Sequence, residues 1–402
     1  MAQREVVFVD GMRSAFGRMG GTIRDILPSH LAAIVMKGLI EKTKITERGK
    51  VDAVMLGSAF GSVNTPNMSR WVTFAAGLPK ETTSHFLEMQ CGSSIDTINH
   101  AAWKILANQA DVVIAGGADS HSNMFFKFPS TTPPYKQLPP MFVMPQLSPN
   151  PEDAVGMGIT AENLATMYSI PREASDEFAY QSQMRAKMAM DNDYFKDEIV
   201  PVVIPGGKKG PDIVFKKDEH PRPETTLEGL AKLPPAFKKD GQVTAGNASG
   251  MNDGASFVLM MSAEKAKELG YKPMAKWITG ADYGCDAKIM GIGPAYAIPF
   301  AMKRSGLKIA DFDHMECNEA FAVQNLAVIK ELEKQTGEKV DRKKWNPLGG
   351  AVAYGHPNGA SGARLCMFTM RQLIRTGGKY GMFSTCVGGG MGICAIIENL
   401  QK

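Results

Sequence analysis

The chain has 402 residues, which at roughly 150 residues per domain predicts two or three structural units. Its 44% hydrophobic and 21% charged residues form a globular composition that excludes disorder, collagen and coiled coils. The net charge of +4 is too small for a dedicated nucleic-acid-binding protein unless it gathers on one face. Six cysteines without a C-x-x-C pair indicate free thiols in a reducing compartment.

The ends of the sequence carry no recognisable targeting signal. Residues 1–10 pass straight into a strand-like apolar run, without the long apolar region and small-residue cleavage site of a secretory signal. Residues 399–402 do not match a peroxisomal signal. We therefore expect a cytoplasmic protein of a prokaryote.

The first third of the chain alternates short β-branched runs, such as 51–57 and 111–117, with segments of helical period. This alternation predicts an α/β protein with central sheets. One helix follows Cys91, because apolar residues recur at three- and four-residue steps from Ile95 to Leu106. Cys91 is therefore expected just before a helix N-terminus, where the helix dipole would lower the pKa of its thiol.

Residues 121–250 differ in composition from what precedes and follows them. They hold eight prolines between positions 129 and 151, and two lysine pairs, Lys208-Lys209 and Lys216-Lys217. A long irregular insertion of this kind is more often a functional loop region than a linker. Helices are predicted at 160–168 and 172–190, so we expect a lid-like subdomain.

The last third repeats the plan of the first. A small-residue turn at 359–362, a helix, a strand at 380–385 and a glycine turn at 388–390 match the order of elements that follows Cys91. The uncharged stretch 380–397 is broken by glycines, which predicts two buried strands rather than a membrane span. We expect two similar halves, residues 1–120 with 251–272 and residues 273–402, and between them a loop domain at 121–250.

Four short motifs place polar or nucleophilic residues beside glycines. They lie at 90–94, 318–321, 355–362 and 386–392. Cys91 is a candidate nucleophile and His356 a candidate base. Taken singly, a cysteine is more often a small buried hydrophobic residue and a histidine more often makes a local hydrogen bond. The sequence contains no complete dinucleotide or P-loop motif and no metal-ligand spacing.

Taken together and in this order, the motifs resemble those of the thiolases, which exchange acyl groups between coenzyme A and a reactive cysteine. The resemblance covers essentially the whole chain and includes residues 10–17, 110–120 and 244–255. It implies a duplicated five-layer α-β-α-β-α fold with an inserted loop domain, and an acyltransferase activity.

The resemblance assigns five catalytic positions. It implies that Cys91 is the acylated nucleophile and that His356 activates first Cys91 and then the incoming CoA thiol. Cys386 would carry a proton to or from the α-carbon of the acetyl group. A water held by Asn318 would form one oxyanion hole with His356, and the backbone N–H groups of Cys91 and Gly388 the other.

The same resemblance places coenzyme A as a co-substrate, with no permanently bound cofactor and no metal. Ser249 is expected at the pantetheine arm and Arg222 at the nucleotide end, and Met157 and Phe237 are assigned to the same site. We interpret the lysine pairs as a solvated face rather than as part of the CoA site.

Two departures from the family pattern bear on the substrate. The motif that often contains histidine in thiolases acting on acetoacetyl-CoA reads Val155-Gly156-Met157-Gly158 here, and the G-H-P motif continues with Asn358 in place of isoleucine. Segments 124–128 and 141–144 are rich in aromatic residues and methionine. We hypothesise a degradative enzyme for a bulky, branched or aromatic 3-oxoacyl-CoA, and ordinary packing is the plainer explanation.

Several alternatives stay open at this point. They are an acetoacetyl-CoA thiolase, a ketoacyl synthase, against which Cys386 argues, and a non-catalytic lipid-carrier or assembly subunit of the same fold. The resemblance implies a homodimer or homotetramer and leaves open a requirement for a small accessory protein subunit. Neither a nucleic-acid partner nor a membrane is expected.

Overall fold

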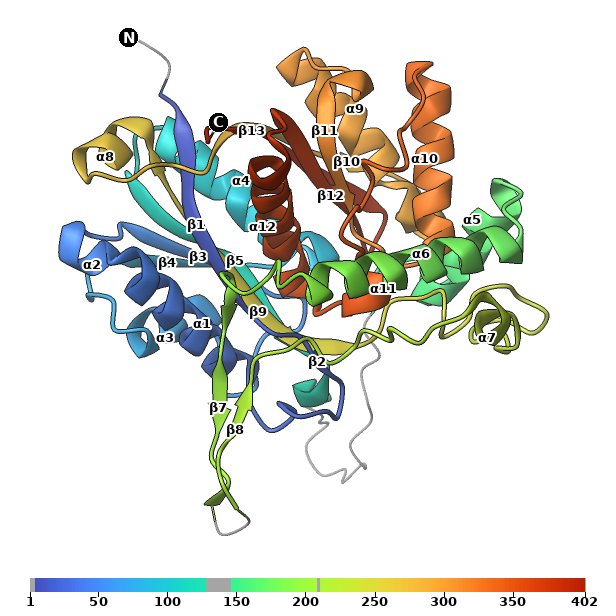
Figure 1. Cartoon of the computed structure of the whole chain (residues 1–402), viewed down its shortest axis with the longest axis horizontal. Coiled ribbons are helices and arrows are strands. Elements are labelled where there is room, and N and C mark those ends of the chain that lie inside the picture. Colours follow the sequence, from blue (N-terminus) through green and yellow to red (C-terminus); the bar gives the residue numbers. More distant parts are fainter. Residues whose placement is uncertain (1–3, 128–145, 208–209, 402) are drawn as a thin grey trace, which may run out of the picture.

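A computed structural model describes residues 4–127, 146–207 and 210–401. Strands and helices alternate along both ends of the chain, as predicted (Figure 1). The N-terminal part holds β1 (Val6–Ser14), β2 (Gly17–Arg18), α1 (Pro28–Thr43), α2 (Ile45–Arg48), β3 (Ala53–Gly57), α3 (Met68–Ala75), β4 (Thr83–Leu87), α4 (Ser93–Leu106) and β5 (Val112–Ser120). After the insertion come β9 (Asn252–Ser262), α8 (Ala263–Glu268), β10 (Ala275–Gly284), α9 (Pro294–Ser305), β11 (Phe312–Cys317), α10 (Ala322–Thr336), α11 (Ala351–Tyr354), α12 (Asn358–Thr376), β12 (Tyr380–Val387) and β13 (Met391–Asn399).

The strands form two halves of matching order. The path through the sheet runs β4-β3-β5-β9-β1 in the first half and continues β10-β13-β12-β11 in the second, with β1 and β10 pairing antiparallel at the junction. In each half one parallel pair, β3·β5 or β11·β12, is followed by two antiparallel pairs. The counterpart of β4 in the second half is a single parallel bridge between Met315 and Trp345. The chain therefore repeats one α/β plan.

Large apolar cores fill the spaces between five layers. One core packs α1 and α3 against the N-terminal half of the sheet, and another packs α9 and α10 against the C-terminal half. A third core lies between the two halves and contains the apolar faces of α4 and α12 (Figure 1). The order α-β-α-β-α confirms the predicted thiolase-like fold, and it brings the N-termini of α4 and α12 into the interior.

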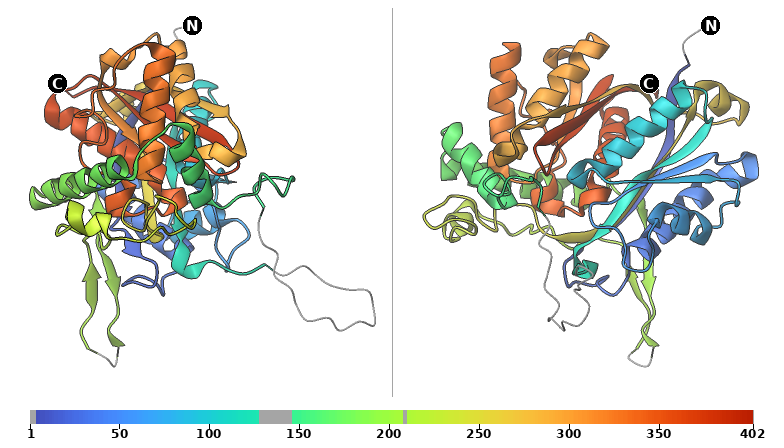
Figure 2. Two further views of the ribbon diagram at one scale, coloured as in Figure 1. Left: turned by 90° about the vertical axis from the view of Figure 1, so that its right-hand side faces the viewer. Right: turned by 180° about the vertical axis from the view of Figure 1, so that it is seen from behind.

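The insertion contributes helices and a projecting hairpin. Its elements are α5 (Met157–Met167), α6 (Arg172–Asp191), β6 (Ile199–Val200), β7 (Val202–Ile204), β8 (Ile213–Phe215) and α7 (Leu227–Ala231). Helices α5 and α6 confirm the two predicted helices within a few residues. Strand β6 pairs with β1, and the β7–β8 hairpin extends away from the body (Figure 2). The domain boundaries drawn from the sequence stay a prediction.

Parts of the sequence-based interpretation fall outside the described residues. These are most of the proline-rich segment, residue 128 and residues 141–144 of the apolar loop, and the pair Lys208-Lys209. The stretch 380–397 forms the buried antiparallel pair β12–β13, as predicted. In the described ranges, no helix is both long and apolar enough to cross a membrane.

Candidate active site

Cys91 lies in a short 3-10 turn, Gln90–Gly92, directly before α4. Gln90 has a left-handed φ of 46°, a conformation that side chains other than glycine rarely adopt. Ser93 ties the turn, because its Oγ accepts from the Met89 N–H at 3.0 Å and donates to the Gln90 carbonyl at 2.7 Å. The sharp turn directs the Cys91 side chain into the interior of the molecule, and Cys91 is only 8% exposed to solvent.

Three N–H donors face the Cys91 sulfur. The backbone N–H groups of Gly388 and of Cys91 itself both donate to it. The third donor is Nδ2 of Asn358, which lies 3.3 Å from Sγ. Gly388 follows β12 directly, so the donors come from both halves of the molecule.

The structure corrects the expected pKa of the Cys91 thiol. Burial raises this pKa to about 12, and the negative charge of Asp119 adds to the effect; the three donors lower it only in part. The sequence suggested that the helix N-terminus would lower the pKa of Cys91. In the structure, desolvation of the buried thiolate raises this pKa by more than the helix dipole could lower it. At rest Cys91 is a thiol.

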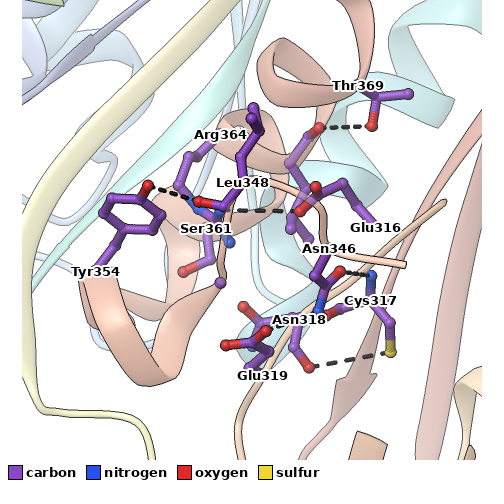
Figure 3. Close-up of polar contacts among 12 residues, drawn as sticks. Glu316, Cys317, Asn318, Glu319, Asn346, Leu348, Tyr354, Ser361, Arg364 and Thr369 are labelled. Atoms are coloured by element: carbon purple, nitrogen blue, oxygen red, sulfur yellow. Dashed lines mark hydrogen bonds and ion pairs between the residues drawn. The ribbon is translucent and has the colours of Figure 1, made fainter. Parts of the chain in front are cut away.

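His356 precedes α12 and is held in one orientation. Its Nδ1 lies 2.6 Å from the Ser361 hydroxyl, which donates its own proton to the Pro357 carbonyl at 3.2 Å. This network assigns the ring proton to Nδ1. Burial lowers the pKa of His356 to about 3, assisted by the charges of His121 and of Arg364, which lies one turn beyond Ser361 on α12 (Figure 3). His356 is thus a neutral imidazole whose Nε2 carries a lone pair and accepts hydrogen bonds.

Asn318 lies directly after β11 and faces His356. Its Nδ2 is 3.3 Å from His356 Nε2, and its backbone N–H donates to the Ser384 carbonyl on β12 at 2.9 Å. The side chain of Asn346 pairs with both the N–H and the carbonyl of Cys317, each at 2.8 Å, and so braces the end of β11 (Figure 3). The Oδ1 of Asn318 is buried and accepts no hydrogen bond from the described residues.

Cys386 lies near the end of β12 and is fully buried. Burial raises the pKa of its thiol well above the ordinary value, and the charge of Cys91 is the next cause. The thiols of Cys91 and Cys386 are therefore close enough for the charge of one to raise the pKa of the other. Within the described part of the chain, no hydrogen bond joins Cys91 directly to His356 or to Cys386.

Three of the residues assigned to CoA gather beside the Asn318 loop. The backbone N–H of Ser249 donates to the Ala320 carbonyl at 2.9 Å. The ring of Phe237 packs against Gly158, the neighbour of Met157, and lies edge-on to Phe321 with ring centroids 6.0 Å apart. Phe237 is 45% exposed, so this surface opens outward from the buried polar residues.

Arg222 is an exposed residue of the insertion. It lines a cavity of about 220 Å³ with His220, Thr225 and Leu233 among its neighbours. The ring of His220 packs against Gly250, whose carbonyl accepts from the His356 backbone N–H at 3.3 Å. A chain of contacts through His220 and Gly250 thus connects the cavity at Arg222 with the backbone of His356.

The other cysteines form no disulfide, and two residues that sequence analysis did not identify, Asn252 and Asp119, bind the backbone around His356. Cys317, Cys366 and Cys394 are buried, Cys285 is partly exposed, and all six cysteines are free. Asn252 accepts from the His356 N–H at 3.1 Å, and Asp119 accepts from the Gly359 N–H at 2.6 Å. Both lie in segments that carried the family resemblance, but their partners are more than 100 positions away. In the described ranges, no group of His, Cys, Asp or Glu could hold a metal.

Comparison with known families decides the assignment. A family model described as "Thiolase, N-terminal domain" matches residues 6–264, and one described as "Thiolase, C-terminal domain" matches residues 271–399. The chain belongs to the thiolase family. It is an acyltransferase of this family, which agrees with the expected class of enzyme and argues against a ketoacyl synthase.

Relatives of this thiolase match it over nearly their whole length. An acetyl-CoA acetyltransferase of Syntrophomonas wolfei is 43% identical, with 99% of this chain and 100% of the relative covered. A β-ketoadipyl-CoA thiolase of Acinetobacter baylyi is 41% identical, with 99% and 100% covered. The crystal structure of human mitochondrial 3-ketoacyl-CoA thiolase in complex with CoA superposes with a TM-score of 0.89 at 38% identity, covering 99% of this chain and 98% of that one.

Proposed function

We propose that the protein cleaves a 3-oxoacyl-CoA with CoA, or runs the reverse Claisen condensation, in two steps through an acyl group on Cys91. The observation that carries the proposal is the surroundings of the Cys91 sulfur. A buried thiol faces the N–H groups of Cys91 and Gly388 and interacts with a second buried thiol, Cys386. Asn358, which contacts the same sulfur, stands two positions after the neutral His356. Fixed donors around a nucleophile in a water-poor site stabilise the negative charge that develops during acyl transfer.

In the first step, His356 Nε2 takes the proton of Cys91 as the sulfur attacks the C3 carbonyl carbon. The two backbone N–H groups stabilise the resulting oxyanion. The C2–C3 bond then breaks, which leaves the acyl group on Cys91 and an enolate of the departing CoA ester. Asn318 Oδ1 is available to hold a water that, with His356, stabilises the enolate oxygen. Cys386 donates its proton to C2.

Between the steps a proton passes from His356 to Cys386, which resets both groups. In the second step, His356 takes the proton of the CoA thiol, and the CoA sulfur attacks the acyl carbon. Cys91 leaves and recovers its proton from His356. Because Cys91 rests as a thiol and His356 as a neutral base, both proton transfers are coupled to carbon–sulfur bond making or breaking.

The contacts that link the cavity at Arg222 with His356 support a CoA site on this side of the molecule. In this assignment the pantetheine arm passes Ser249, Met157 and Phe237, and Arg222 contacts the nucleotide end. The CoA complex of the human relative favours such a substrate. An arginine suits a phosphate because its planar fork presents several donors.

For the acyl group we propose a bulky, branched or aromatic 3-oxoacyl chain and a degradative role. The described part of the loop after β5 exposes Met124, Phe125 and Phe126, and an amide takes the place of an aliphatic side chain at Asn358. The relative named β-ketoadipyl-CoA thiolase supports a larger 3-oxoacyl group. The alternative, an acetoacetyl-CoA thiolase, is favoured by the relative named acetyl-CoA acetyltransferase.

We also propose a homodimer, or a tetramer built from two dimers. Strand β4 lies at the end of the sheet and pairs only with β3 among the described strands, so its free edge supports pairing with a second copy. An accessory subunit and a cytoplasmic location remain predictions from the sequence. Light scattering on the purified protein measures the oligomeric state.

The function is tested by thiolysis assays with a series of 3-oxoacyl-CoA esters. Cys91→Ser should abolish thiolysis, whereas the buried but remote Cys366→Ala should retain it. Full thiolysis by Cys91→Ser would end the proposal. Prior acylation should also block iodoacetamide labelling of Cys91, an outcome that a non-catalytic carrier would not give. A preference for acetoacetyl-CoA in kcat/KM would replace the bulky-substrate assignment with the alternative.

A further inference from the structure

Asn358 is the one side chain that donates a hydrogen bond to the Cys91 sulfur among the described residues. It is the first residue of α12, and its Nδ2 lies 3.3 Å from Sγ although 267 positions separate the two residues. The family motif usually has isoleucine at this position, which offers no donor.

The packing around α12 fixes the place of this amide. The Gly359 N–H donates to Asp119 at 2.6 Å, and the Ala363 N–H donates to Ser94 Oγ on α4 at 3.0 Å. A Cβ atom on Gly359 would lie 2.8 Å from the Gly57 carbonyl oxygen. The starts of α4 and α12 are thus locked together, and Asn358 is held where it meets the sulfur.

We propose that Asn358 is a catalytic residue whose side-chain amide stabilises negative charge on the Cys91 sulfur. This inference rests on the proposed function, since it requires Cys91 to be the nucleophile. The sulfur carries negative charge twice in the cycle, when it attacks the C3 carbon and when it leaves the acyl group. The amide keeps its protons in both steps and acts only as a donor.

The charges around Cys91 explain why such a donor matters. Asp119 on β5 opposes the thiolate, as does burial, and Cys386 on β12 is a second acid in the same site. His356, in the loop before α12, is neutral and adds no positive charge. Among the described residues, N–H groups counter the negative charge on Cys91, and the Asn358 amide is the one that a point substitution removes.

Two variants of nearly equal size test the proposal. Asn358→Ile restores the usual family residue and removes the donor, and Asn358→Asp replaces the donor with a negative charge. Gln372→Leu, which removes an amide further along α12, is the matched control. The second-order rate of iodoacetamide labelling of Cys91, measured by peptide mass spectrometry from pH 7 to 9, reports on the thiolate without any acyl substrate.

A hydrogen bond to a charged group changes an equilibrium roughly 10- to 100-fold. A less stable thiolate is also a stronger nucleophile, which offsets about half of this effect on a logarithmic scale. We expect labelling to slow roughly 3- to 10-fold in Asn358→Ile, to slow further in Asn358→Asp, and to stay unchanged in Gln372→Leu. Labelling of Asn358→Ile at the original rate, or faster labelling of Asn358→Asp, would overturn the proposal.

The proposed role of Asn358 and the proposed thiolysis reaction can fail independently, and the experiments distinguish the two failures. If thiolysis proceeds through Cys91 and the Asn358 variants label normally, only the role of Asn358 fails. If the labelling rates follow the expected order and no CoA ester is turned over, the donor is present and the proposed function fails. If both proposals hold, kcat for thiolysis should be about tenfold lower in Asn358→Ile than in wild type.

Discussion

The side-chain amide of Asn318 donates to Nε2 of His356 across 3.3 Å, from a loop 38 positions earlier in the chain. This contact joins the segment after β11 to the segment before α12. Together with the Ser361 contact at Nδ1, it fixes both nitrogens of the imidazole ring. His356 can therefore act only as a proton acceptor at Nε2 until the reaction begins.

Replacement of this amide should slow the chemical step. We expect Asn318→Ala to lower kcat roughly 10²- to 10³-fold, because the water that Asn318 holds, which is a donor of the oxyanion region, is lost. KM for the acyl-CoA should change little. Steady-state thiolysis measures both quantities, with the exposed Asn150→Ala as the control. A kcat within twofold of wild type would remove Asn318 from the mechanism.

The close approach at Gly359 should be sensitive to a single methyl group. A Cβ atom there would lie 2.8 Å from Asp119 Oδ2 and from the Gly57 carbonyl oxygen, so Gly359→Ala should lower the free energy of unfolding by about 1–3 kcal/mol. Gly156→Ala is the matched control, because no atom lies within 4 Å of its added Cβ. Urea unfolding compares the two, and equal midpoints would contradict the packing argument.

The low pKa of His356 should make the fold sensitive to acid. His356 keeps a pKa of about 3 when folded and an ordinary value near 6.5 when unfolded, so between these values only the unfolded chain binds the proton. Stability should therefore fall as the pH drops below 6.5. From pH 6.5 to 5 the wild type should lose about 1.5 kcal/mol more than His356→Gln. Parallel stability curves for the two proteins would show that His356 is not buried as a neutral ring.

Local sequence patterns predicted the elements of the fold well. Helix α6 and the β12–β13 pair follow directly from helical period and from apolar runs broken by glycine. The position of Cys91 before α4 was also readable, because polar residues crowd the first turn of that helix. These features depend on neighbours in the sequence, and so a single sequence contains them.

Long-range properties of the site could not be read in the same way. The sequence predicted a lowered pKa for Cys91, whereas burial and Asp119, which lies on β5, raise it. The Asn358 contact depends on the close approach of α12 to α4, where Gly362 packs against Ser94 and Ile95 from a distant part of the chain. Desolvation and helix crossing are set by the whole fold, and therefore only the structure shows them.

The CoA assignment distinguishes Arg222 from the lysine pair Lys216-Lys217, which lines a different cavity. We expect Arg222→Ala to raise KM for CoA about 5- to 10-fold with little change in kcat, because a phosphate contact is lost in the ground and transition states alike. Lys216→Ala should leave KM within twofold, as expected for a solvated charge. CoA-dependent thiolysis at fixed ionic strength measures both. The reverse order of effects would move the nucleotide site to the β7–β8 hairpin.

The central claim is that Cys91 carries the acyl group. Wild-type protein is mixed with a 3-oxoacyl-CoA in the absence of free CoA, quenched in acid and digested, and the peptides are weighed by mass spectrometry. We predict an acyl adduct on the peptide that contains Cys91, its loss when CoA is added, and its absence in Cys91→Ser. An adduct on Cys386 instead, or turnover with no adduct on Cys91, would contradict the account.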